Sequence, residues 1–212
     1  MKKVVIIITL SVLGVCISFA QSINKANIDA IKKQVENKAK TFCKYVVAVG
    51  TTAGQAGAVA DDTKTDIIRN RVPGLFWDYY EAPRYMLTTN GPYGEIIRKR
   101  KMSDYFISLK AQSRGAINSA RKYELRYVGI VGNGNTDGFK RERILSDGCE
   151  LWSTMVRIKQ LYHKINFRSP NADYRAVEQV ETTVKDYIVY IIIKPNGKAG
   201  IYLGDVKRAY NE

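Results

Sequence analysis

Cysteine, proline and histidine are all scarce in this sequence. Its 212 residues include three Cys, five Pro and one His. Three Cys are too few for a disulfide-built scaffold, and five Pro with 16 Gly exclude a collagen-like or proline-rich chain. One His cannot build a His-rich metal site, so we expect no metal.

Motifs that mark common enzyme classes are absent as well. The sequence contains no Gly-x-Ser-x-Gly nucleophile elbow, no His-Glu-x-x-His zinc motif and no phosphate-binding P-loop. Acid–base catalysis at neutral pH needs a titrating group tuned by burial and by its neighbours, and the sequence offers no recognisable pair for it. We therefore predict no catalytic residue and no cofactor.

Residues 1–20 have the pattern of a secretory signal peptide. Two lysines begin the segment, an almost wholly apolar stretch follows, and Ser18 and Ala20 supply small residues ahead of a cleavage site at Gln21. We therefore expect export to the periplasm or the extracellular space. A lipoprotein acylated at Cys16 is the weaker alternative because a valine precedes that residue, and a membrane anchor would need a longer apolar run.

Basic residues outnumber acidic ones, 34 against 20, which gives a formal charge of +14 at pH 7. The 45% hydrophobic and 25% charged residues are typical of a globular chain. Export would exclude nucleic acid as a partner and leave anionic polysaccharides or lipid head groups. The alternative is a solvated basic face that keeps the protein soluble.

The mature chain reads as a single domain, residues 21–212, because no internal repeat or Ser/Pro linker divides it. Residues 28–49 predict a long amphipathic helix. Its apolar positions, at spacings of three and four, are Ile31, Val35, Ala39, Phe42, Val46 and Val49. We expect this stripe to pack into the concave face of a sheet.

Shorter elements and then long β-rich runs follow this helix. A second helix is predicted from Asp62 or Thr63, two strands flank the turn at residues 90–94, and Ser103 is predicted to cap a third helix. After Arg121, short turns separate the β-rich runs. Short turns can join only antiparallel strands, so these runs predict an antiparallel meander. Helices followed by such a meander predict an α+β fold.

This order of elements resembles the nuclear-transport-factor-2-like superfamily over residues 28–210. The resemblance implies a cystatin- or nuclear-transport-factor-2-like cone, in which a long N-terminal helix and shorter helices pack on a strongly bent antiparallel sheet. The Tyr-rich, basic character and the Ser-Phe-Ala-Gln cleavage region also look like small secreted proteins of Bacteroidetes. Members of the superfamily range from isomerases and dehydratases to binding modules, so the fold leaves the function open.

The aromatic side chains are the best candidates for a binding site. The sequence has 14 Tyr, six Phe and two Trp, and amphipathic rings suit pockets and interfaces. We expect Trp77, Tyr80, Trp152 and Tyr162 to form the walls of a concave ligand-binding pocket, with His163 beside them. The alternative is ordinary core for each ring and a half-exposed strand position for His163.

Three functional hypotheses remain. The favoured one is an exported, non-catalytic ligand-binding or scaffold domain with a concave pocket. Its partner would be a small molecule or a protein, and a homodimer is compatible with this hypothesis. The second is a small-molecule isomerase, dehydratase or hydrolase that uses His163, Asp78 or Glu81. The third is a surface protein that binds polyanions. Cys43 and Cys149 form either a disulfide or two separate buried thiols.

Overall fold

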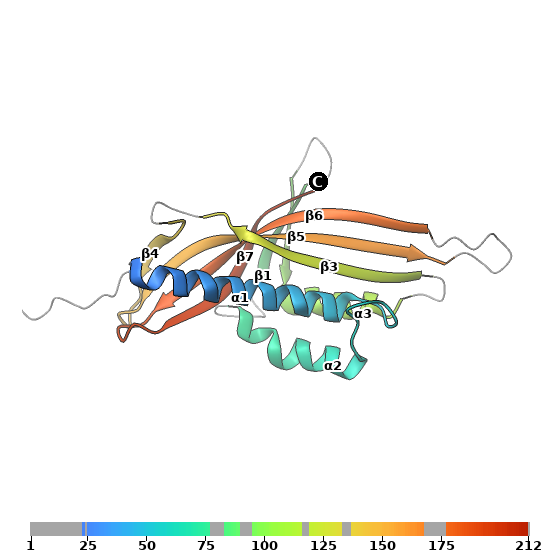
Figure 1. The fold of residues 1–212 in the computed structure, drawn as a ribbon, viewed down its shortest axis with the longest axis horizontal. Coiled ribbons are helices and arrows are strands. Elements are labelled where there is room, and N and C mark those ends of the chain that lie inside the picture. The colour runs from blue at the N-terminus through green and yellow to red at the C-terminus, as the bar shows by residue number, and fades with distance from the viewer. Residues whose placement is uncertain are drawn as a thin grey trace, which may run out of the picture.

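The fold is α+β, with three α-helices packed on a five-stranded antiparallel sheet that is not closed (Figure 1). It is seen in a computed structural model that describes residues 23, 25–76, 83–89, 95–115, 119–132, 137–167 and 177–211. The side chains of residues 24–26, 83–89, 95–100 and 208–211 are not among those described. The predicted signal peptide, residues 1–20, lies outside the described residues.

The helices come before the long strands along the chain, in the order that the sequence predicts. In chain order they are α1 (Lys25–Gly50), α2 (Asp61–Asp66), the π-helical η1 (Ile67–Arg71), the 3-10 turn η2 (Pro73–Leu75), β1 (Pro83–Thr89), β2 (Glu95–Lys101), α3 (Met102–Ser113), β3 (Ser119–Ile130), β4 (Lys140–Ile144), β5 (Glu150–Asn166), β6 (Val177–Ile193) and β7 (Ala199–Asn211). One local prediction is wrong. Ser103 does not cap α3, because the helix begins at Met102 and its N-cap position is Lys101.

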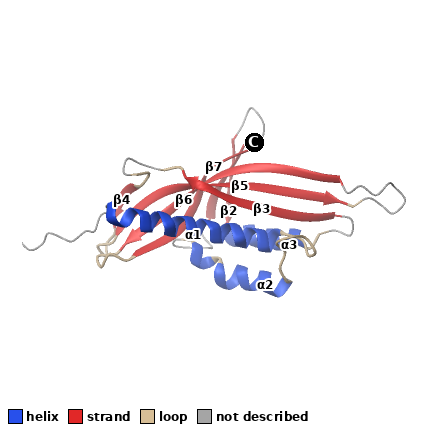
Figure 2. Cartoon of the chain, in the orientation of Figure 1, coloured by secondary structure: helices blue, strands red, loops and turns tan. Residues whose placement is uncertain are grey.

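The large sheet has the strand order β3-β5-β6-β7, and β4 pairs with the first residues of β5. Every pairing is antiparallel, as the short turns predict. The strands β1 and β2 form a separate hairpin, and β1 lies beside β7. All the helices lie on the same side of the long strands (Figure 2). The sheet therefore has an inner face covered by helices and an opposite, outer face.

The core lies between α1 and the inner face of the sheet. All six predicted apolar positions of the 28–49 stripe are buried, so that prediction is confirmed. The Phe42 side chain has no exposed surface, and its ring centroid lies 6.1 Å from those of Phe76 and Phe106 and 5.2 Å from that of Tyr187. Edge-to-face rings at these distances pack well without voids. Aromatic side chains from α1, α3 and β6 thus fill the space between the helices and the sheet.

Cys43 and Cys149 are both buried and free. Of the two alternatives that the sequence leaves open, the structure has two separate thiols. Burial raises the pKa of Cys43 to about 12, and burial together with the Asp147 carboxylate raises that of Cys149. Neither thiol is therefore activated as a nucleophile near neutral pH.

Candidate functional site

Two of the five predicted pocket residues, Trp77 and Tyr80, lie outside the described residues. The same holds for Asp78 and Glu81, the carboxylates considered for catalysis. The other three predicted residues, Trp152, Tyr162 and His163, all lie on β5. Their positions on that strand test whether they share one pocket.

Trp152 and Tyr162 both face the helices, but the structure does not bring them together. Ten residues along a strand correspond to about 33 Å. Trp152 is only 6% exposed, and its indole N–H donates to Oε2 of Glu150 at 2.8 Å, so it is part of the core. The Tyr162 ring lies 5.1 Å from the ring of Tyr123 at the other end of the strand.

His163 lies on the outer face of the sheet, opposite to its neighbour Tyr162, because successive strand residues alternate between the faces. It is 9% exposed, and its Nδ1 lies 2.6 Å from Oε1 of Glu178. Its Nε2 lies 3.6 Å from Oε1 of Glu124 and has no hydrogen-bond partner. The histidine therefore links carboxylates on β3 and β6 and does not contribute to an inner pocket.

A buried lysine on the inner face was missed by the sequence analysis. Lys185 on β6 is only 7% exposed, and burial lowers its pKa to about 8. Its ammonium donates to Oε1 of Gln160 at 3.2 Å and lies 6.0 Å from the ring centroid of Tyr105. Alternation along β6 could have found it, since it lies two residues from the buried Tyr187 and four from Val189.

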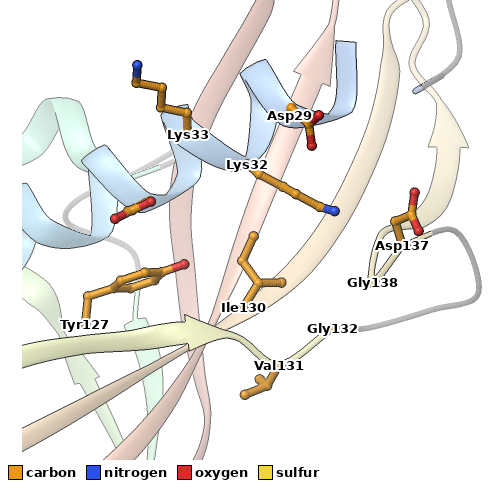
Figure 3. Close-up of a pocket in the computed structure, with 10 residues that line it drawn as sticks. Asp29, Lys32, Lys33, Tyr127, Ile130, Val131, Gly132, Asp137 and Gly138 are labelled. Atoms are coloured by element: carbon orange, nitrogen blue, oxygen red, sulfur yellow. The ribbon is translucent and has the colours of Figure 1, made fainter. Parts of the chain in front are cut away.

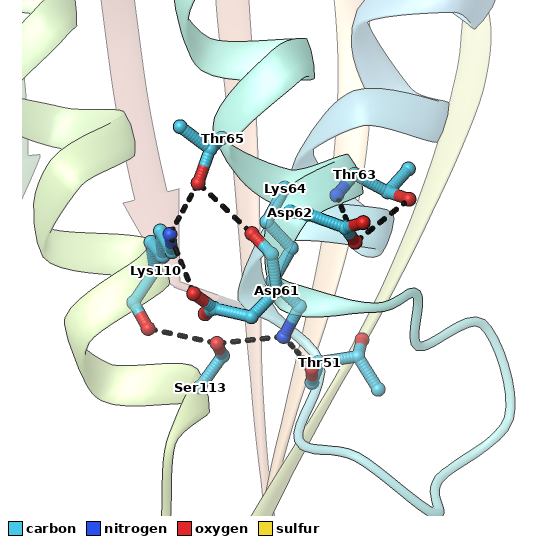
Figure 4. Close-up of polar contacts among 8 residues, drawn as sticks. All are labelled: Thr51, Asp61, Asp62, Thr63, Lys64, Thr65, Lys110 and Ser113. Carbon is cyan, nitrogen blue, oxygen red and sulfur yellow. Dashed lines mark hydrogen bonds and ion pairs between the residues drawn. The ribbon is translucent and has the colours of Figure 1, made fainter.

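A second buried lysine, Lys64, joins three helical segments through neutral partners (Figure 4). Its ammonium donates to the backbone carbonyl of Thr51 and to Oγ of Ser113, both at 2.7 Å. Beside it, the Lys110 ammonium lies 2.9 Å from the Asp61 carboxylate, and its hydrogen bond lowers the pKa of that carboxyl. Burial lowers the pKa of Lys64. These contacts fix α2 against α3 and the end of α1, so the cluster has a structural role.

A long groove runs between α1 and β3. Two cavities of about 730 and 780 Å³ lie side by side along it and share the lining residues Glu36 and Tyr127. The first is lined by Asp29, Lys32, Lys33, Glu36, Tyr127, Ile130, Val131, Gly132, Asp137 and Gly138 (Figure 3). The second is lined by Glu36, Lys40, Cys43, Lys44, Val47, Gly57, Leu125, Arg126, Tyr127 and Val128.

The helix and the strand lie side by side because the end of α1 is attached to the start of β3. Thr52 N–H donates to the carbonyl of Arg121 at 2.8 Å, and Arg121 N–H donates to Oγ1 of Thr52 at 3.0 Å. From there the two elements run antiparallel. Residues 29–50 of the helix and 121–130 of the strand each span about 30 Å, so the helix accompanies the strand to its end.

Cations dominate the groove. Five basic side chains line it, against three carboxylates; the cations are Lys32, Lys33, Lys40, Lys44 and Arg126, and the anions are Asp29, Glu36 and Asp137. Lys40 pairs with Glu36 at 2.5 Å. The other four cations make no ion pair within the described part of the chain. The ammonium of Lys32 extends from α1 toward the end of β3 (Figure 3).

Part of the β3 edge that borders the groove pairs with no other strand among the residues that the structure describes. The N–H of Tyr123 donates to Oγ1 of Thr51 at 3.3 Å, so the 51–52 segment covers the edge at Arg121 and Tyr123. Alternation then points the N–H and C=O groups of Leu125 and Tyr127 away from β5. A register shift between Tyr127 and Gly129 ends this stretch. An open edge of this kind can accept another strand.

Two glycines close the far end of the groove. Gly132 and Gly138 have φ values of 80° and 89°, in the left-handed region that disfavours other residues. A Cβ atom on Gly132 would lie 3.3 Å from the Cα of Gly138, and one on Gly138 would lie 3.2 Å from the Cα of Gly132. The backbone therefore folds back tightly here, which places Asp137 at the mouth of the cavity (Figure 3).

No protein-family model matches the chain, and no curated protein or solved structure matches it either. Within the described ranges, no group of three or more His, Cys, Asp and Glu side chains could hold a metal ion. No helix in that part of the chain is long and apolar enough to cross a membrane. The groove between α1 and β3 is the candidate site on its geometry and charge alone.

Proposed function

We propose that this protein is an exported, non-catalytic binding domain that holds an anionic ligand in the groove between α1 and β3. The observation that carries the proposal is the set of four basic side chains along the groove that have no ion-pair partner among the described residues: Lys32, Lys33, Lys44 and Arg126. Like charges held together repel one another, so a ligand with several negative charges relieves that repulsion and is attracted over a long range.

The proposed architecture is a nuclear-transport-factor-2-like cone, in which the sheet bends around α1. The order of α1, α2, the β1 and β2 hairpin, α3 and the long strands supports it. In such a cone an internal ligand would lie between the helices and the sheet. The rings of Phe42, Phe106 and Tyr187 occupy that space. This filling favours a surface groove over an inner pocket, and binding over catalysis. The pattern of residues 1–20 supports the proposed export.

Lys185 favours one second candidate, a small-molecule enzyme. An amine whose pKa is about 8 is partly neutral at pH 7 and can act as a base or a nucleophile. Substrate screening for isomerase, dehydratase or hydrolase activity tests this candidate. An activity that disappears in Lys185→Met, while the variant keeps its circular dichroism spectrum, would favour the enzyme over the binding domain.

Heparin retention tests the proposed function, with heparin as a model polyanion. The mature protein is compared with a groove variant, Lys32→Gln, Lys33→Gln and Lys44→Gln together. The control variant replaces three exposed lysines outside the groove, Lys164, Lys194 and Lys198, by glutamine. Both variants lose the same charge, so any difference between them reports position.

We expect the groove variant to elute at clearly lower salt than the control variant. Fewer phosphate-like or sulfate contacts release fewer counterions, which also reduces the dependence of binding on salt. Equal elution of the two variants would mean that the basic charge acts as a diffuse solvated surface. The proposed function would then be wrong.

A further inference from the structure

We infer that the ligand of this groove is an acidic peptide that adds as an extended strand to the open edge of β3. The inference rests on the proposed function and specifies its ligand. It depends on three features that occur together at this groove: backbone groups that have no partner among the described residues, apolar side chains beside them and lysines on α1.

The backbone groups of the open edge belong to Leu125 and Tyr127. Each residue directs its N–H and its C=O outward, and none of these four groups has a hydrogen-bond partner in the described part of the chain. The neighbouring stretch of the same edge already accepts outside groups from Thr51 and Thr52. The open stretch ends at the register shift beyond Tyr127. The edge can therefore pair with about four to six residues of an extended chain.

The side chains along the edge fit an extended peptide better than a rigid polyanion. Val128, near the end of β3, lines the groove and is 55% exposed. Alternate residues of an added strand would face the groove, about 6.7 Å apart. On α1, Lys40 and Lys44 are four residues apart, or about 6 Å along the helix axis. Two acidic side chains separated by one residue of a peptide would therefore match the spacing of Lys40 and Lys44, although Glu36 already pairs with Lys40.

Charge also decides between a foreign peptide and a second copy of this chain. A second copy that paired at the same edge would bring its own Lys32, Lys33 and Lys44 to the groove. The whole chain carries a formal charge of +14, so the two copies would repel each other. An acidic segment gains attraction at the same position. Polysaccharides and lipid head groups could meet the cations, but they lack backbone donors and acceptors to pair with β3.

The test uses a capped eight-residue peptide in which Glu and Val alternate, and measures its affinity by fluorescence anisotropy. Two matched peptides carry the same charge but are N-methylated, one at every Glu and the other at every Val. The Glu side chains of a bound peptide would face the groove. In an antiparallel addition the N–H groups of these Glu residues donate to β3, so methylation at Glu blocks pairing. In a parallel addition the N–H groups of the Val residues donate to β3, so methylation at Val blocks pairing. Because only the peptide is altered, the protein stays intact.

We expect the unmodified peptide to bind and one of the two methylated peptides to bind at least tenfold more weakly. The groove variant should also weaken binding at least tenfold. If neither methylation weakens binding but the groove variant does, the inference is wrong and the proposed function stands. If the groove variant and the control variant bind every peptide equally, the inference and the proposed function are both wrong. A dimer in sedimentation equilibrium that the peptide dissociates would assign the edge to a second copy and overturn the inference.

Discussion

The two sides of α1 differ in how completely the rest of the molecule covers them. One side carries Val35, Phe42 and Val46, none of which has any exposed surface. The other side carries Lys33 and Lys44, which line a groove and make no ion pair within the described residues. The comparison shows that stability and recognition use opposite sides of one helix. Changes on the first side should alter unfolding, and changes on the second should alter binding.

The largest expected effect is on the packed side. Phe42→Ala should lower the free energy of unfolding by about 3 to 5 kcal/mol, because it leaves a cavity among three neighbouring rings. Denaturant unfolding measures the change. Lys44→Ala, on the groove side of the same helix, is the matched control and should change stability by less than about 0.5 kcal/mol. A loss below about 1 kcal/mol for Phe42→Ala would mean that α1 is peripheral to the core.

The second effect is a gain of stability inside the packed region. Lys185→Met removes a charge that burial disfavours, at the cost of one hydrogen bond to Gln160. The pKa falls from 10.5 unfolded to about 8 folded, so between these values the unfolded state binds more protons and wild-type stability rises with pH. We expect the variant to be more stable by about 2 kcal/mol at pH 7.

The pH dependence separates this explanation from better packing alone. The advantage of Lys185→Met should shrink as the pH rises from about 8 to 10.5. The raised pKa of Cys43 lowers stability with rising pH above about 9, but it does so in both proteins and cancels in the difference. Urea unfolding at several pH values gives the difference curve. A constant advantage across this range would contradict the proposed burial of a charged amine.

The third effect concerns the end of the groove. Gly132→Ala should cost about 1 to 2 kcal/mol, because alanine must adopt a φ of 80° and its Cβ would press on Gly138. Gly129→Ala is the control, since a Cβ there meets no atom within 4 Å. Thermal unfolding of the two variants compares them directly. Equal costs would show that the tight turn at Gly132 is not maintained in solution.

The smallest effect on stability is expected on the groove side itself. The groove variant with Lys32, Lys33 and Lys44 replaced by glutamine should unfold within about 0.5 kcal/mol of wild type, because exposed charges contribute little. The same variant should elute from heparin at lower salt than the control variant. Parallel measurement of unfolding and retention would thus place the two properties on opposite sides of α1. A large loss of stability would show that the lysines help to hold the fold.

The sequence predicted the features that depend on local periodicity. The spacing of Ile31, Val35 and Phe42 identifies the buried side of α1, and the short turns identify the antiparallel meander. Features that depend on distant pairing were not predicted. No local pattern shows that Thr52 covers the edge at Arg121 and leaves the next residues of β3 open.

The predicted site illustrates the same limit. Aromatic character alone selected Trp152 and Tyr162, although ten residues of extended chain separate them. Alternation places His163 on the face opposite to Tyr162, and the sequence does not show which of these two faces the helices cover. Helical periodicity places the basic residues of α1 away from its apolar stripe. That they line a groove became visible only once β3 lay beside them.

The separate, buried thiols bear on how the protein reaches its folded state. Because Cys43 and Cys149 are not joined, folding does not require an oxidant or a disulfide isomerase. The fold should therefore form equally well in a reducing cytoplasm and in an oxidising compartment. The burial that keeps Cys43 protonated also protects it from oxidation, so the core tolerates a change of redox environment.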